Sequence, residues 1–314
     1  MKNVEKGIWT RKLIAAAVLT PALLVVGCSD DDYEPESPEP TTTISGKAYD
    51  GYLADARVCV DENLNKACDG GEPTTTTDAG DFTIEGLNAT QARLPLVLEA
   101  TPSTTDLDTG NSVSPSLRYT APGGAKVISG FSTIIQSLVE TELANGNTSS
   151  LADISDQMAN DLATGLGGIN VDLLSFDPIA ARLDSGATQQ ERKAAAVLHL
   201  TNRVLTEQLV TVYDAAESQS SNKEAVFGAS VKKLDPGTVK SDVEAQTSGL
   251  APDDTVQTPP GSITTTPPAT PTPADITVAE QEDQAADDAI EDKVEDGDNG
   301  TGGTGGTGGT GGTI

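Results

Sequence analysis

The segment Asp61–Glu72, with the sequence DENLNKACDGGE, carries oxygen-bearing side chains at positions 1, 3, 5, 9 and 12 of a twelve-residue stretch. A hard divalent cation needs about six to eight oxygens around one point, and this spacing is that of a calcium loop. The sequence therefore predicts a calcium site, with a solvated acidic turn as the alternative, because Asp, Asn and Gly also favour turns. The predicted ligands are Asp61, Asn63, Asn65, Asp69 and Glu72, with the backbone carbonyl of Ala67 at position 7.

Two features of this segment depart from the usual calcium loop. Position 6 is normally Gly, because the chain turns there with positive φ, but here it is Lys66. We therefore expect a strained or altered turn and a weakened affinity. The flanking residues alternate like strands, since Ala56–Val60 precedes the loop and a threonine run follows it. This pattern predicts a loop that joins two strands instead of two helices.

The N-terminus is typical of an exported protein. Residues 1–27 are predicted to be a signal peptide, because a basic start precedes the apolar run Leu13–Val26, which is short for a membrane span. The run ends in Val25-Val26-Gly27-Cys28, which resembles the lipobox of bacterial lipoproteins. The resemblance implies lipidation of Cys28 and anchoring in the outer membrane. A signal peptide that is cleaved in the ordinary way, with an incidental Cys28, is the alternative.

An acidic, proline-rich segment follows the predicted lipidation site. Residues 28–43 are expected to form a disordered tether. The acidic run that follows Cys28 looks like the surface-export signals of some bacterial lipoproteins, which favours exposure at the cell exterior. The alternative is a solvated linker with no role in sorting.

The two remaining cysteines, Cys59 and Cys68, bracket the first part of the acidic loop. A disulfide between them would close a ten-residue loop and contribute roughly 2.5–3 kcal/mol in the chain-entropy model. Two reduced thiols are the alternative, but export to an oxidising compartment favours the disulfide.

The charge of the chain limits its partners. The 314 residues have a formal net charge of −29, and aromatic residues make up only 3%. Such an acidic surface repels nucleic acid and attracts divalent cations. We therefore expect no nucleic-acid partner and cores built from aliphatic side chains.

Hydrophobic periodicity divides the rest of the chain into three parts. Residues 44–125 contain short alternating strands at intervals of about ten residues, which predicts a small β-sandwich. Residues 126–247 have apolar side chains at helical spacing, which predicts an α-helical bundle. Residues 248–314 comprise a Thr/Pro tract, an acidic segment and a Gly-Thr repeat, which predict a disordered tail. The expected fold class is therefore α+β multidomain, with the sandwich first and the bundle second.

Several short motifs in the β region carry a resemblance to known modules. They are Ile44-Ser-Gly-Lys-Ala-Tyr49, Asp61-x-Asn63-x-Asn65, Asp69-Gly-Gly-Glu-Pro73 and Thr77-Asp-Ala-Gly-Asp-Phe-Thr83. In this order they look like carboxypeptidase-regulatory-like and Cna-B-type β-sandwiches of bacterial surface proteins, several of which carry an EF-hand-like calcium loop. The stretch Asp172–Ile179 looks like part of a helical segment that often follows such sandwiches in surface lipoproteins. The resemblance implies a stalk or interaction module.

The sequence offers little support for catalysis. The single histidine, His199, lies in a long predicted helix and has no evident catalytic partner nearby in sequence, so we interpret it as an ordinary helix histidine. No nucleophile elbow, phosphate-binding loop or zinc-protease motif is present. A carboxylate-based hydrolase remains the enzymatic alternative, and we predict no enzymatic activity.

Together these patterns predict a surface structural, adhesive or interaction module, with a surface protein or matrix component as its partner. The alternative is a lipoprotein that binds a small ligand or partner in a pocket between the two domains.

Overall fold

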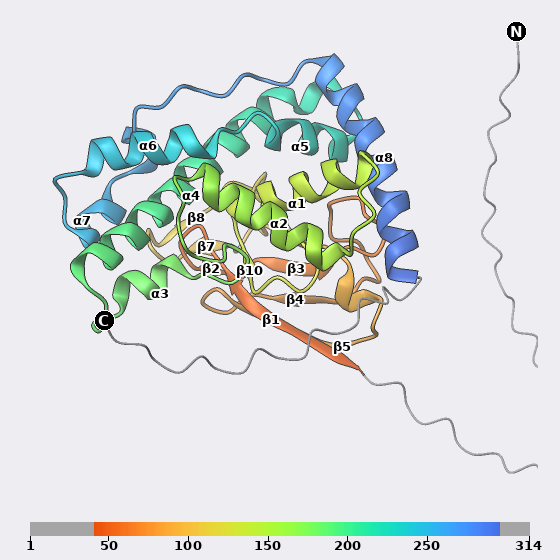
Figure 1. The fold of residues 1–314 in the computed structure, drawn as a ribbon, viewed down its shortest axis with the longest axis horizontal. Coiled ribbons are helices and arrows are strands. Elements are labelled where there is room, and N and C mark those ends of the chain that lie inside the picture. Colours follow the sequence, from red (N-terminus) through yellow and green to blue (C-terminus); the bar gives the residue numbers. More distant parts are fainter. Residues whose placement is uncertain (1–40, 296–314) are drawn as a thin grey trace, which may run out of the picture. The chain divides into compact units, whose positions relative to one another are not determined.

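The structure, a computed structural model, describes residues 41–295. The signal peptide, Cys28, the tether up to residue 40 and the Gly-Thr repeat lie outside the described residues. Within them, all strands fall between residues 42 and 128, and all α-helices fall between residues 130 and 295 (Figure 1). The chain therefore mixes α and β structure, as the sequence predicts.

Ten short strands form three small sheets in the described part of the chain. Their orders are β10-β1-β5, β2-β7-β8 and β4-β3-β6-β9. All pairings are antiparallel except β1 with β10, which are parallel. The strands are β1 (Thr42–Ala48), β2 (Leu53–Ala54), β3 (Arg57–Val60), β4 (Thr74–Thr76), β5 (Asp81–Leu87), β6 (Leu96–Glu99), β7 (Thr105–Asp106), β8 (Asn111–Ser112), β9 (Arg118–Ala121) and β10 (Val127–Ile128).

Eight α-helices follow between residues 130 and 295, and the first four begin at side chains that cap them. Ser129 and Thr188 form capping boxes at the starts of α1 and α4, and Asp177 caps α3 ahead of Pro178. The helices are α1 (Gly130–Ala144), α2 (Leu151–Gly165), α3 (Pro178–Leu183), α4 (Gln189–Ala216), α5 (Lys223–Val231), α6 (Pro236–Thr247), α7 (Pro252–Gln257) and α8 (Pro273–Glu295).

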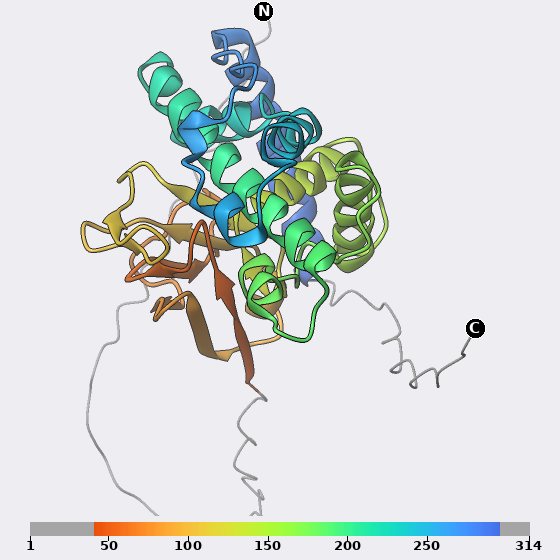
Figure 2. The same cartoon turned by 90° about the vertical axis from the view of Figure 1, so that its left-hand side faces the viewer.

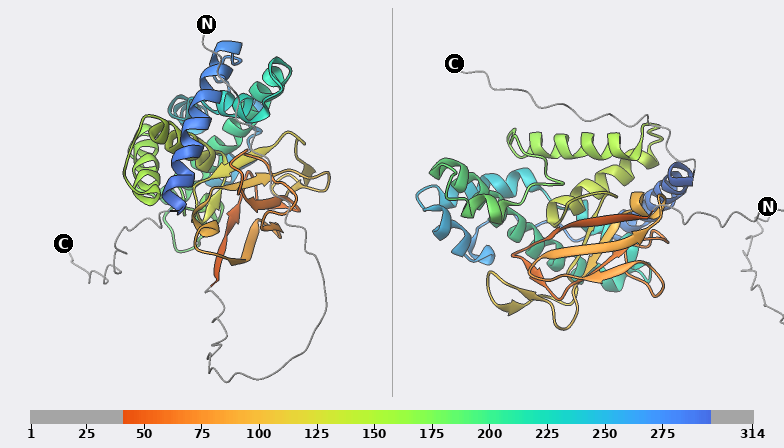
Figure 3. Two further views of the ribbon diagram at one scale, coloured as in Figure 1. Left: turned by 90° about the vertical axis from the view of Figure 1, so that its right-hand side faces the viewer. Right: turned by 90° about the horizontal axis from the view of Figure 1, so that it is seen from below.

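The strands and the helices share one hydrophobic core. The helices gather on one side of the strands, as Figures 2 and 3 show. α1 packs against β9 and β10, and Thr133 of α1 accepts a hydrogen bond from the backbone N–H of Thr120 in β9 at 3.0 Å. Phe131, Tyr119 and Leu205, from a helix, a strand and another helix, all belong to this core. The predicted boundary near residue 125 therefore lies inside a continuous packed interior.

Residues 248–295 differ from the expectation of a disordered tail. They contain α7 and the long α8, which packs against α1 and α5. α8 buries a narrow stripe of side chains at spacings of three and four residues: Ile276, Ala279, Asp283, Ala286, Ile290 and Val294. The high acid content of this segment hides the stripe in the sequence. Two hydrogen bonds connect the intervening Thr/Pro tract to α6. The side-chain amide of Gln246 donates to the backbone carbonyl of Thr264 and accepts from its backbone N–H.

Among residues 41–295, no helix combines the length and the apolar character that crossing a membrane requires.

Candidate functional site

The acidic loop joins β3 to β4, which pair antiparallel and hold its two ends together. This confirms the prediction of a loop between strands. Asp61, at position 1, is only 2% exposed. Its two carboxylate oxygens accept hydrogen bonds from the backbone N–H groups of Asn65 at 3.0 Å and Lys66 at 2.8 Å. The chain therefore curls around the carboxylate of Asp61.

The other predicted ligands belong to the same hydrogen-bonded curl. Asp69 accepts hydrogen bonds from the side-chain amides of Asn63 and Asn65, both at 2.8 Å. Glu72 reaches back to the backbone N–H groups of Glu62 at 3.1 Å and Asp69 at 2.7 Å. The backbone N–H of Ala67 donates to the side-chain oxygen of Asn65 at 2.9 Å.

The donor set fits a hard cation in its chemistry, since five side chains offer oxygens and three of them are carboxylates. In the arrangement described, N–H groups engage these carboxylates. No group of three or more His, Cys, Asp or Glu side chains in residues 41–295 is placed to hold a metal ion. A cation would therefore have to draw carboxylate oxygens away from N–H donors.

Burial dominates the electrostatics of the loop. It raises the pKa of Asp61 to about 7, partly offset by the backbone N–H of Lys66 and reinforced by the charge of Glu72. Hydrogen bonds from Asn63 and Asn65 lower the pKa of the exposed Asp69. A nearby cation would favour the ionised form of Asp61.

Lys66 adopts φ +57°, the left-handed region that favours glycine, so the turn at position 6 keeps its sharp form. Its side chain is 4% exposed and leaves the loop for the helices. The ammonium lies 3.1 Å from Asp283 of α8, and 3.4 Å from both Glu140 of α1 and Glu224 of α5. These three acids and Lys66 form what we call the Lys66 cluster. The side-chain contacts of the cluster account for a lysine at this position.

The Lys66 cluster keeps an excess of acid. Burial lowers the pKa of Lys66, but its carboxylate partners raise it more, so the net shift is upward. Burial raises the pKa of Glu140, and Lys66 offsets part of that shift. The neighbouring Asp287 has a pKa raised to about 8, again mainly by burial. The cluster therefore holds Lys66 charged, while burial opposes the ionisation of Glu140.

The predicted disulfide between Cys59 and Cys68 is present, with a Cα–Cα distance of 5.7 Å. It ties β3 to the second half of the loop. Arg57 adds two hydrogen bonds of 2.8 Å to the carbonyl groups of Cys68 and Asp69. The loop is therefore fixed at its start by strand pairing and in its middle by a covalent bond.

A second polar region lies at the interface between the strands and α4, and the sequence did not point to it. His199 is fully buried, and its Nε2 lies 2.6 Å from the backbone carbonyl of Asp50 and 3.2 Å from a carboxylate oxygen of Asp108. Burial lowers the pKa of His199 to about 4, so the ring is neutral at pH 7. The neutral ring donates from Nε2, and its buried Nδ1 has no hydrogen-bond partner. His199 therefore also connects α4 to the turn at Asp50 through a buried hydrogen bond.

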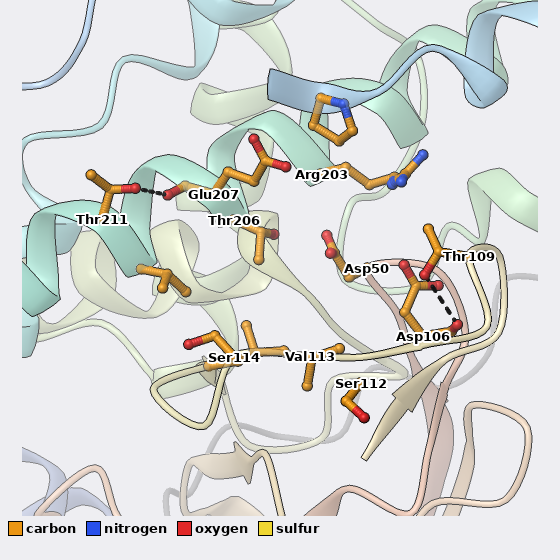
Figure 4. Close-up of a pocket in the computed structure, with 13 residues that line it drawn as sticks. Asp50, Asp106, Thr109, Ser112, Val113, Ser114, Arg203, Thr206, Glu207 and Thr211 are labelled. Atoms are coloured by element: carbon orange, nitrogen blue, oxygen red, sulfur yellow. Dashed lines mark hydrogen bonds between the residues drawn. The ribbon is translucent and has the colours of Figure 1, made fainter. Parts of the chain in front are cut away.

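Next to this histidine is a cavity of about 350 Å³, shown in Figure 4. One wall is α4, with Arg203, Thr206 and Glu207, and the other is formed by Asp50 and the segment around β7 and β8, including Asp106. Burial and the charge of Asp106 raise the pKa of Asp50 to about 7. Pro260, from the segment expected to be disordered, also lines the cavity.

One sequence signal could have revealed this cavity. His199, Asn202, Arg203 and Thr206 are polar and buried at spacings of three and four residues along α4. A polar stripe at helical spacing within an otherwise apolar face marks a buried polar interface. Asp50 and Asp106 gave no comparable signal, because each lies in a turn or short strand far away in the sequence.

Comparisons of the chain with protein-family models, with curated proteins and with solved structures found no match.

Proposed function

We propose that the chain is an exported, lipid-anchored protein whose loop at residues 61–72 binds calcium. The supporting observation is that its oxygen donors at positions 1, 3, 5, 9 and 12 lie in one curl around the buried Asp61. The fold that the loop stabilises is a small β-sandwich followed by a helical bundle, in the arrangement that the resemblance implies. The role is structural, adhesive or interactive at the outer-membrane surface, and non-catalytic.

Calcium would neutralise the carboxylates of the loop, and Asp61, Asn63, Asn65, Asp69, Glu72 and the Ala67 carbonyl would hold it. Strand pairing and the disulfide keep these donors close, which reduces the entropy lost on binding. Lys66 directs its charge away from the loop into the helices, so its ammonium does not compete for the ligands. An affinity on the order of 10⁻⁴–10⁻³ M is expected, as for extracellular modules.

The test is the melting temperature of the oxidised full chain in EDTA, in calcium and in magnesium. A concentration ten times the Kd adds about 1.4 kcal/mol of stability, which corresponds to a rise of roughly 3–6 °C for a domain of this size. Calcium should produce the rise and magnesium should not.

Variants locate the site in the same experiment. Asp69→Ala should abolish the calcium-dependent rise, whereas Glu85→Ala, at an exposed position of β5, should keep it. An equal rise in both variants would show that calcium binds at another site.

The proposed lipid anchor rests on the sequence around Cys28. Labelling of cells with a palmitate analogue should mark the wild-type chain, and Cys28→Ser should remove the label. A labelled Cys28→Ser variant would contradict lipidation at this residue.

A second candidate function is the binding of a small ligand between the strands and the helices. The supporting observation is the cavity of about 350 Å³, which draws its lining from both parts of the chain. Its volume lies at the lower end of the range for small-molecule sites, about 300–1,000 Å³.

A further inference from the structure

Arg203 is a buried charged side chain that has no ion-pair partner in residues 41–295, and it lines the cavity between the strands and α4. It is 7% exposed, and one terminal nitrogen donates to the backbone carbonyl of Val256 at 2.8 Å. Its buried Nε has no hydrogen-bond partner, and no carboxylate in residues 41–295 lies within 4.0 Å of the guanidinium. The similarly buried Arg182 also has an Nε without a hydrogen-bond partner, but its terminal nitrogen pairs with Asp253 at 2.7 Å.

A buried guanidinium without an anion is costly, because burial removes water that would otherwise solvate the charge. The planar guanidinium can donate two parallel hydrogen bonds to a carboxylate. Since Arg203 lines the cavity, its guanidinium can meet the carboxylate of a molecule that enters the cavity.

Acids face Arg203 across the cavity. Figure 4 shows the carboxylate of Asp50 directed toward the side on which Arg203 and Glu207 lie. Asp50 accepts a long hydrogen bond of 3.4 Å from the side-chain amide of Asn202. Asp106 is 6% exposed and accepts the backbone N–H of Asp108 at 2.8 Å. These two carboxylates line the cavity and are available to a cation or a hydrogen-bond donor of a ligand.

The cavity is lined by both positive and negative side chains, which limits the charge that a ligand can carry. A simple anion would meet Arg203 but also the repulsion of Asp50, Asp106 and Glu207, whereas a simple cation would leave Arg203 without a partner. A molecule with both charges satisfies both walls.

We propose that the cavity binds a small zwitterion, a free α-amino acid, with its carboxylate on Arg203 and its ammonium between Asp50 and Asp106. This inference rests on the second candidate function above. Val113, Leu117 and Val210 also line the cavity and would receive the apolar part of the amino acid. Thr206, on the α4 wall of the cavity, is held by hydrogen bonds to the hydroxyl of Tyr119 at 2.5 Å and the carbonyl of Asn202 at 2.9 Å.

The test begins with melting curves of the full chain in the presence of each of the twenty common α-amino acids, followed by calorimetric titration of those that raise the melting temperature. Two matched probes accompany each hit, namely its deaminated acid and its decarboxylated amine. Glucose serves as a neutral polar probe. The hit should bind at least tenfold more tightly than either of its matched probes, because each probe leaves one buried charge unpaired.

Variants test each wall separately. Arg203→Gln and Asp106→Asn should each weaken amino-acid binding at least tenfold, and Arg93→Gln, a change outside this cavity, should leave it unchanged. Circular dichroism and the melting temperature establish whether each variant is folded. Because the two variants lie on opposite walls, one of them still tests the proposal if the other does not fold.

The failures of the two proposals are distinguishable. If glucose or a singly charged probe binds in the cavity and no amino acid does, the proposal of a zwitterionic ligand is wrong, but the proposal of a ligand-binding cavity is supported. If no probe binds, both proposals fall. Amino-acid binding that is equally strong in Arg203→Gln and Asp106→Asn would place the ligand elsewhere and also overturn the inference.

Discussion

The Lys66 cluster and the polar face of α4 both bury charge, but only in the first does the buried cation lie beside carboxylates, even though Oδ2 of Asp283 has no hydrogen-bond partner in residues 41–295. The ammonium of Lys66 has three carboxylates within 3.4 Å. On α4, in contrast, His199 Nδ1, Asn202 Oδ1 and Arg203 Nε have no hydrogen-bond partner in the described part of the chain. Removing one partner of a paired buried charge leaves the other uncompensated, whereas unsatisfied polar groups beside a cavity are available to a ligand. The comparison therefore assigns a structural role to one region and a binding role to the other.

The largest effect is expected from Lys66→Met. Removing the lysine leaves Glu140 and Asp283 buried without their cation, which should lower the free energy of unfolding by about 3–5 kcal/mol. Urea denaturation of the oxidised chain measures the loss. Lys47→Met is the matched control, because its ion pair with Asp81 is exposed and contributes at most about 1 kcal/mol. Equal losses in the two variants would contradict a structural role for the cluster.

The loop should impose a pH dependence of a few kcal/mol, at about 1.4 kcal/mol per unit of pKa shift. Asp61 has a pKa of about 7 in the folded chain and 3.8 as its ordinary value, so the folded state binds the proton more tightly. Its contribution to stability is therefore fully present below about pH 4 and is lost as the pH rises toward 7.

The difference between the wild type and Asp61→Asn isolates this contribution, because other acids titrate in both proteins. Urea denaturation at several pH values should show a steeper decline for the wild type between pH 4 and pH 7. Calcium should flatten that decline, since it favours the ionised carboxylate. Parallel curves for the two proteins would contradict the burial of a protonated Asp61.

Removal of the disulfide should cost roughly 2.5–3 kcal/mol. The double variant Cys59→Ala with Cys68→Ala tests this value by urea denaturation, and the reduced wild type provides an independent comparison. The double variant should also bind calcium more weakly, because the two halves of the loop are no longer joined. An unchanged calcium affinity would show that strand pairing alone holds the ligands.

The smallest effect on stability is expected from Arg203→Met, although the same kind of change at Lys66 is severe. Replacing an unpaired buried charge by an apolar side chain of similar volume should alter stability by less than about 1 kcal/mol, or increase it. Amino-acid binding should be lost in the same variant. A loss of stability as large as that of Lys66→Met would place Arg203 among the structural residues.

Local signals predicted a β-rich part up to about residue 125, helices after it, and a loop between two strands. Ser129 and Ser150 cap the starts of α1 and α2, and the pair Gly167-Gly168, with positive φ, follows the end of α2, so these ends depend on neighbouring backbone groups. The disulfide followed from the closeness of two cysteines in the sequence. These features depend on residues within a few positions of one another.

The long-range contacts could not be predicted in the same way. Lys66 looked like a defect of the loop because its partners Glu140 and Asp283 lie on helices far along the chain. The apolar stripe of α8 was missed because it is narrow, contains small alanines and includes Asp283, whose burial makes sense only beside Lys66. The cavity is lined by several segments that lie far apart in the sequence, so the sequence alone does not show that these residues meet.

The most direct test of the calcium site is equilibrium dialysis of the full chain with radioactive calcium at pH 7 and about 0.15 M salt, which screens diffuse binding to the acidic surface. The proposal predicts one ion per chain with a Kd on the order of 10⁻⁴–10⁻³ M. This binding should persist in Glu85→Gln and disappear in the double variant Asp61→Asn with Glu72→Gln. Equal binding in the wild type and the double variant, or no saturable binding at all, would contradict the calcium site.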